Sequence, residues 1–134
     1  MGRRFFLRIQ AGTSRLIFRP GPSAPYHFAF NLPRNQMGQA HEWLSGRLPL
    51  PSDEEGQSVM SFPRWNAHSV YFTDPAGNIL ECIARHNLAN HSRLPFGPSR
   101  WLEISEVGLV VEDVAASAAM LSSALSLTYF DGQG

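Results

Sequence analysis

The feature that most constrains this chain is a short turn with strand-forming residues on both sides. The turn Asp74-Pro75-Ala76-Gly77-Asn78 separates residues 69–72 from residues 79–84, two runs rich in β-branched and aromatic side chains. Proline presets one turn position, and a Gly-Asn pair tolerates positive φ angles. The pattern therefore predicts an antiparallel β-hairpin over residues 69–84.

Strand and helix patterns occupy most of the remaining chain. We expect strands over residues 5–10, 14–19, 26–30, 58–65, 102–111 and 127–130, and helices over residues 34–44 and 115–125. Gly46 predicts the end of the first helix, and Glu112 and Asp113 predict an acidic first turn for the second. Residues 48–57 and 87–100 carry prolines and little periodicity, so they predict a loop and a linker, and residues 131–134 have turn chemistry.

Composition favours one compact domain and excludes several classes of protein. The chain has 134 residues, of which 43% are hydrophobic and 16% are charged, as expected for one globular core. Lys+Arg and Asp+Glu both number 11, so no net charge attracts nucleic acid or an anionic membrane. Cys82 has no second cysteine to pair with, and no stretch approaches the roughly 18 apolar residues of a membrane helix. We expect a cytoplasmic protein that binds neither nucleic acid nor membrane.

The order of the expected elements contains a repeat that wraps around the two ends of the chain. The strand at His27 and its following helix resemble the strand at Glu106 and its following helix, while Gly12 and Gly77 each precede a strand. Joining the last residue to the first would turn residues 101–134 and 1–22 into a second unit like 23–86, with 87–100 as the linker. Such units must pair to bury their faces. The two halves could meet within one chain, by circular permutation, or between chains, in a swapped homodimer. Alternatively, the patterns resemble each other by chance, or the chain is a piece of a longer protein.

One segment resembles a known superfamily. Tyr71-Phe72-Thr73-Asp74-Pro75-Ala76-Gly77-Asn78-Ile79-Leu80-Glu81 is similar to the YF-x-DP-x-GN-x-x-E pattern of vicinal-oxygen-chelate proteins, which include glyoxalases, bleomycin resistance proteins and extradiol dioxygenases. The strand–helix openings at Tyr26 and Ile104 resemble the starts of that family's modules, so the resemblance covers most of the chain. It implies a single α+β domain over residues 1–134. In this domain paired βαβββ modules form a half-open mixed barrel, with one module split between the N- and C-terminal ends.

The resemblance also implies a metal site. In that family a divalent metal lies inside the barrel, bound by residues of the first and last strands of each module. The matching positions are His27 and Glu106 on first strands and Glu81 on a last strand, whereas the fourth falls near Leu16 and Ile17, which offer no ligand atom. Three protein ligands with open positions are typical of a catalytic metal, and this donor set suits Fe(II), Mn(II), Zn(II) or Ni(II). The small residues two positions after His27 and Glu106 would leave room beside a ligand.

Each candidate residue also has a plainer interpretation. His27 could be a hydrogen-bonded strand histidine, Glu81 could face solvent, and a one-residue register slip would turn Glu106 to the other face. His68 could be the catalytic acid/base beside the metal, or a loop histidine that caps a turn. Arg85 and the histidine after it could bind an anionic substrate, or form a solvated strand end.

Two functions follow from these residues. The first is a metal-dependent enzyme of the glyoxalase/dioxygenase type that acts on a small substrate with neighbouring oxygens. The second is a metal-free small-molecule-binding module resembling bleomycin resistance proteins, with Phe28, Phe30, Trp65 and Tyr71 lining a cleft. The missing fourth ligand favours the second function. Glu106 argues against the extradiol subtype, whose common ligand set is two histidines and one glutamate.

Overall fold

A computed structural model describes residues 6–22 and 24–129 as an α+β fold. The strands are β1 (Leu7–Ala11), β2 (Ser14–Phe18), β3 (His27–Leu32), β4 (Met60–Phe62), β5 (Ala67–Thr73), β6 (Ile79–Arg85) and β7 (Glu103–Gly108), and the helices are α1 (Met37–Ser45) and α2 (Val114–Leu125). Two short 3₁₀ helices, Pro63–Trp65 and Pro98–Arg100, complete the described elements. The fold class predicted from the sequence is thus confirmed as α+β.

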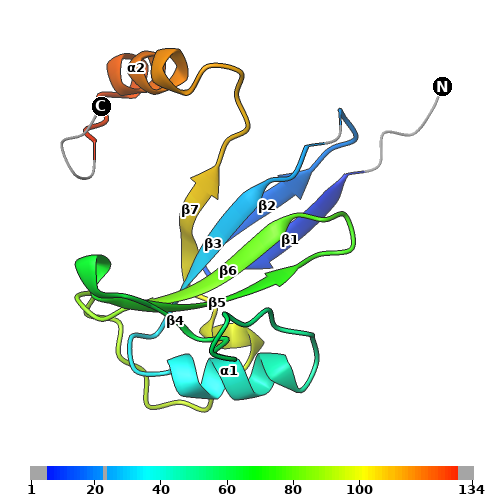
Figure 1. Ribbon diagram of the computed structural model, residues 1–134, viewed down its shortest axis with the longest axis vertical. Coiled ribbons are helices and arrows are strands. Elements are labelled where there is room, and N and C mark those ends of the chain that lie inside the picture. Colours follow the sequence, from blue (N-terminus) through cyan, green and yellow to red (C-terminus); the bar gives the residue numbers. More distant parts are fainter. Residues whose placement is uncertain (1–5, 23, 130–134) are drawn as a thin grey trace.

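The strands form one five-stranded mixed sheet and one separate two-stranded sheet. The order of the larger sheet is β4-β5-β6-β3-β7, and β1 pairs with β2 alone. β3 lies between β6, to which it is parallel, and β7, to which it is antiparallel, so the sheet is mixed. Helix α1 covers one face of this sheet (Figure 1), where Leu44 packs against Leu32, Val70 and Cys82. Within the described residues the sheet remains open, and no closed barrel forms.

The predicted hairpin is confirmed as β5 and β6, which pair antiparallel around the turn at Asp74. One carboxylate oxygen of Asp74 accepts hydrogen bonds from the backbone N–H groups of Ala76 and Asn78, both at 2.9 Å. Burial alone would raise the pKa of Asp74, but these bonds and the one from the Asn78 side chain hold it below its usual value. Asn78 also accepts a hydrogen bond from the backbone N–H of Tyr26 at 3.0 Å, so the turn is tied to the start of β3.

Several expected boundaries were wrong, each for a tertiary reason. α1 begins at Met37 rather than at residue 34, because Arg34 donates its N–H to the Asn90 side chain and Gln36 donates to Leu94. The linker is therefore docked on this helix start. The strand expected over residues 58–65 ends at Phe62, where Pro63 opens a 3₁₀ turn.

The C-terminal strands were also predicted too long. β7 ends at Gly108, and the buried strand expected over 102–111 is a half-exposed edge strand with Val107 49% exposed. Residues 127–129 of the expected last strand do not form one, and the rest of that strand, the turn at 131–134 and Phe5 lie outside the described residues.

Helix α2 is apolar and yet lies apart from the sheet. It begins at Val114, and Asp113 is its N-cap rather than part of the predicted acidic first turn: the Asp113 side chain accepts a hydrogen bond from the N–H of Ala116 at 2.9 Å. Its own residues remain unburied, including Val114 at 73% and Met120 at 63% exposure. Figure 1 shows α2 beyond the end of β7, on the other side of the sheet from α1. No helix among the described residues is long and apolar enough to cross a membrane.

The turn of the β1–β2 hairpin is attached to the start of β7. The backbone N–H of Thr13 donates to the carbonyl of Leu102 at 2.8 Å, and the Ser14 hydroxyl accepts from the N–H of Ile104 at 2.9 Å. Gly12 adopts a φ of 56°, and a Cβ placed on it would fall 1.7 Å from the carbonyl oxygen of Leu102. Glycine is therefore required there both for its backbone conformation and for this close approach.

We predict that Gly12→Ala strongly destabilises the protein. Gly56→Ala provides a matched control, because Gly56 also has a positive φ of 80° but has open space around its Cβ position. The control should lose about 1 kcal/mol from left-handed backbone strain alone. Gly12→Ala should lose roughly 1–3 kcal/mol more, because the chain at Leu102 must move. Urea denaturation measures both free energies of unfolding, and equal losses would contradict the predicted contact.

Candidate metal centre

Three strands bring His27, Glu81 and Glu106 together on the sheet face opposite α1. In the register of the sheet, Ala29 of β3 pairs with Glu81 of β6 on one side and with Glu106 of β7 on the other. His27 lies two residues before Ala29 and so points to the same face. One ligand atom from each of the three residues lies within 4.8 Å of the other two. The set of residues named from the sequence is thus a group that could hold a metal ion.

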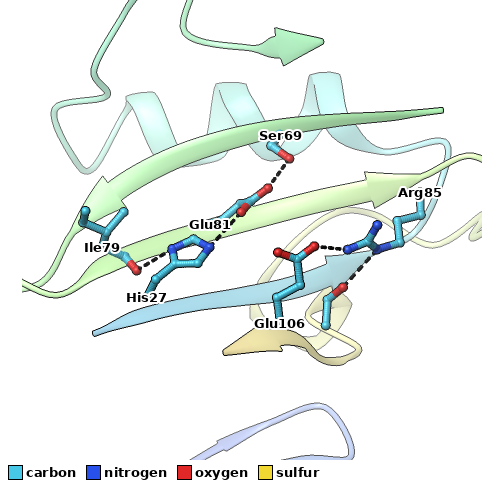
Figure 2. A network of polar contacts seen from close by, with 7 residues as sticks. His27, Ser69, Ile79, Glu81, Arg85 and Glu106 are labelled. Atoms are coloured by element: carbon cyan, nitrogen blue, oxygen red, sulfur yellow. Dashed lines mark hydrogen bonds and ion pairs between the residues drawn. The ribbon is translucent and has the colours of Figure 1, made fainter. Parts of the chain in front are cut away.

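The imidazole of His27 is oriented by a backbone carbonyl. Its Nδ1 atom lies 3.2 Å from the carbonyl oxygen of Ile79, which can only accept a hydrogen bond (Figure 2). Nδ1 must therefore carry the hydrogen, and in the neutral ring Nε2 presents a lone pair. Metal-binding histidines are commonly oriented by this kind of outer hydrogen bond.

The Nε2 atom of His27 lies 3.1 Å from the Oε2 atom of Glu81. In the neutral ring both atoms are hydrogen-bond acceptors, so their approach requires a positive charge shared between them, either a proton on Nε2 or a bound cation. Two ligand atoms each about 2.1 Å from one metal, at a right angle, lie about 3 Å apart. The observed separation fits two neighbouring ligands of one ion.

The carboxylate of Glu81 is buried, with 3% of the residue exposed. Its Oε1 atom accepts a short hydrogen bond from the hydroxyl of Ser69, which lies on the neighbouring strand β5. A buried carboxylate is costly unless it is paired or hydrogen-bonded, and Ser69 and His27 supply those partners. Glu81 is thus held in one orientation, with Oε2 toward His27 (Figure 2).

Tyr71 joins the same face, two residues after Ser69 in β5. Its ring stacks with that of His27, with 6.3 Å between the ring centroids. Burial, followed by the negative charge of Glu81, raises the pKa of Tyr71 to about 12. The phenol is therefore neutral at physiological pH and available as a hydrogen-bond donor beside the two carboxylates.

Glu106 is paired with the guanidinium of Arg85, which extends from the end of β6 (Figure 2). The Nε atom of Arg85 also donates to the hydroxyl of Ser105 at 3.0 Å. Successive residues of a regular strand point to opposite faces, but the pairing of β3 with β7 skips Ser105. This bulge turns both side chains toward the same arginine, as bulges near functional sites often do.

Two small residues lie close to the ligand group on this face. Gly108 pairs with His27, and a Cβ on Gly108 would lie 2.9 Å from the Cβ of His27. Any larger residue would therefore displace the imidazole. Ala29, which is fully buried, pairs with both glutamates.

The structure does not bring His68 to this group. His68 precedes Ser69 in β5 and pairs with Ala84, which belongs to the core beneath α1, so its side chain lies on the opposite face of the sheet. Its Nδ1 atom lies 2.7 Å from Nε2 of His86. His68 is inside β5, so it is not the loop histidine of the alternative interpretation either.

The sequence analysis missed Ser69 and the pairing of Arg85 with Glu106, and it named Tyr71 only as a cleft-lining aromatic residue. Strand alternation around Glu81 carries a signal for Ser69 and Tyr71, because residues 69 and 71 share one face of β5. The aromatic residues expected to line one cleft are divided between the two faces: Phe30 packs on Trp101 beneath the sheet, and Trp65 packs beside Ala29.

No model of a known protein family matches this chain, and no curated protein matches it significantly. Functional inference therefore depends on the geometry and chemistry of the group around His27.

The raised pKa of Tyr71 predicts a specific alkaline loss of stability. Because the folded state holds this proton more tightly than the unfolded state, the contribution is present below pH 10 and is lost as the pH rises from 10 toward 12. Between pH 10 and 11, the free energy of unfolding should fall more steeply in the wild-type protein than in Tyr71→Phe. Glu81→Gln should reduce this extra slope, since it removes a charge that raises the pKa. Urea denaturation at each pH measures the slopes, and identical slopes in wild type and Tyr71→Phe would contradict the expectation.

Proposed function

We propose that this chain is a metal-dependent enzyme of the vicinal-oxygen-chelate type, in which His27, Glu81 and Glu106 hold one divalent cation. The observation that carries the proposal is the 3.1 Å approach of the His27 Nε2 atom to the Glu81 carboxylate, while Nδ1 donates to Ile79. Nitrogen and carboxylate donors suit Fe(II), Mn(II), Zn(II) or Ni(II). Three protein ligands would leave open positions for a small substrate with neighbouring oxygens.

The chemistry divides between the cation and the residues of the chain. A bound divalent cation would act as a Lewis acid toward the two substrate oxygens and favour loss of a proton from the substrate. Ser69 and Ile79 keep Glu81 and His27 in their ligand orientations. The phenol of Tyr71, whose ring stacks with that of His27, could donate a hydrogen bond to negative charge that develops on a substrate oxygen. Ala29 and Gly108 are small enough to let His27, Glu81 and Glu106 converge on this face.

The topology supports the family assignment. β3, α1, β4, β5 and β6 follow one another as a βαβββ unit, with the first strand parallel to the last. In the second unit that we propose, β7 and α2 would supply the first half and β1 and β2 the second half. The bonds that Thr13 and Ser14 make near the start of β7 attach the turn of the β1–β2 hairpin there, while β2 and β7 lie in separate sheets.

We propose that a second copy of the chain covers α2. Helix α1 buries Met37, Ala40 and Leu44 against the sheet of the complete unit, whereas α2 leaves Val114 and Met120 exposed. Exposed apolar surface of this kind is typical of a subunit interface. A swapped homodimer would place α2 of each copy against the β1–β2 hairpin of the other.

Light scattering coupled to gel filtration tests this association. The wild-type protein should elute as a dimer, and Met120→Asp on the exposed α2 should shift it toward monomer. A matched control, Glu112→Asp just before the helix, leaves the apolar surface intact and should remain dimeric. A monomeric wild-type protein at all concentrations would contradict the dimer and favour permutation within one chain.

Metal content tests the proposed centre. Tag-free protein reconstituted with Fe(II), Mn(II), Zn(II) or Ni(II) should hold about one ion per chain, and His27→Ala should weaken its binding at least about a hundredfold. His68→Ala removes a histidine from the opposite face of the same sheet and should retain full binding. Calorimetry and elemental analysis measure both, and circular dichroism checks that the variants fold. Loaded protein that binds metal should then be screened for turnover of vicinal diols and α-ketoaldehyde adducts.

A metal-free binding module is the second candidate, and one observation favours it. A cavity of about 300 Å³ lies between the β1–β2 hairpin and the main sheet, lined largely by apolar residues that include Leu16, Phe18, Phe30 and Trp101. Cavities of about this size hold small organic ligands. Failure of all four metals to bind wild-type protein would overturn the metal-dependent enzyme and favour this module.

A further inference from the structure

The guanidinium of Arg85 lies beside Glu106 and balances the negative charge of its carboxylate. It pairs with the Glu106 carboxylate, is held by the Ser105 hydroxyl at 3.0 Å, and lies 5.9 Å from the ring centre of Trp65. The side chain is 21% exposed, so it is anchored but still accessible to a small solute. Neither His27 nor Glu81 makes this contact, so Glu106 is the ligand whose charge Arg85 balances.

The formal charges of the group determine which ligands it favours. With Glu81 and Glu106 negative and Arg85 positive, a divalent cation held by the same residues would give the group one net positive charge. Attraction between opposite charges is strong in a partly buried site, so such a site favours an anion with a single charge over a neutral molecule of the same shape.

We propose that Arg85 determines substrate charge at this site: it balances Glu106 when no metal is bound, and it binds the carboxylate of a monoanionic substrate when Glu106 ligates the metal. The substrate class is a small carboxylate with a neighbouring hydroxyl or carbonyl oxygen. This inference rests on the proposed metal centre. Arg85 contacts a carboxylate oxygen of Glu106, so its guanidinium lies next to one of the residues that would hold the cation.

The two roles of Arg85 predict effects of opposite sign. Removing its charge with Arg85→Gln leaves the Glu106 carboxylate without its counter-charge, so Mn(II) should bind several-fold more tightly, up to about tenfold. The same substitution removes the charge-assisted bond to an anionic ligand, so that ligand should bind at least about tenfold more weakly. A variant that is simply unstable would weaken both kinds of binding.

Glycolate and glycolamide are the appropriate probes. Both offer a hydroxyl and a carbonyl oxygen on neighbouring carbons, but glycolate carries one negative charge and glycolamide none. Mn(II) affinity is measured by calorimetry, and binding of each probe to Mn(II)-loaded protein is followed by Mn(II) electron paramagnetic resonance. Arg85→Gln should lose glycolate affinity and keep glycolamide affinity, while Arg85→Lys should keep the Mn(II) affinity of wild type and part of the glycolate affinity.

The control is Arg47→Gln, which makes the same charge change just after helix α1, where Arg47 stacks on Trp43. It should alter neither Mn(II) nor glycolate binding. Absence of Mn(II) binding by the wild-type protein would overturn the metal centre and the role of Arg85 with it. Mn(II) binding with an equal effect of Arg85→Gln on glycolate and glycolamide would overturn the role of Arg85 alone and leave the metal centre standing.

Discussion

The pairing of β3 with a strand on each side is the constraint on which the site depends. Ala29 pairs with Glu81 in the parallel strand β6 and with Glu106 in the antiparallel strand β7. Its methyl group is small enough to let the two carboxylates converge above it. His27 then enters the same space because two residues along a strand return to the same face. A shift of one residue in either pairing would separate the three side chains.

This convergence creates an electrostatic cost that the neighbouring residues offset. Two carboxylates at a partly buried position repel each other and lose hydration, which is unfavourable without compensation. Ser69 donates to Glu81, Arg85 neutralises Glu106, and the phenol of Tyr71 stays protonated beside both. The bulge at Ser105 also helps to position Arg85, because it lets Ser105 and Glu106 of β7 contact the same guanidinium. Arg85 and Tyr71 are also the residues that we propose contact a substrate.

The two parts of the fold differ in how fully they are packed. The unit from β3 to β6 encloses α1 and a core of apolar side chains, with its site on the other face of the sheet. The β1–β2 hairpin lines one side of a cavity, and β7 and α2 leave apolar side chains exposed. The site nevertheless draws one of its three residues, Glu106, from this less enclosed part. The proposed partner that covers α2 would therefore influence the position of Glu106, because α2 follows β7 in the chain.

The sequence by itself determined the β5–β6 hairpin and the start of α2, because turn and capping chemistry acts among residues a few positions apart. Together with a family resemblance, it also identified His27, Glu81 and Glu106 as a group. Tertiary structure decided the rest: the side of β5 on which His68 lies, the start of α1 and the pairing of Arg85 with Glu106. These features depend on the register between strands and on contacts with the linker, which join residues far apart in the chain. Local patterns carry little information about such pairings, since a shift of one residue changes the face of every side chain while the sequence pattern stays the same.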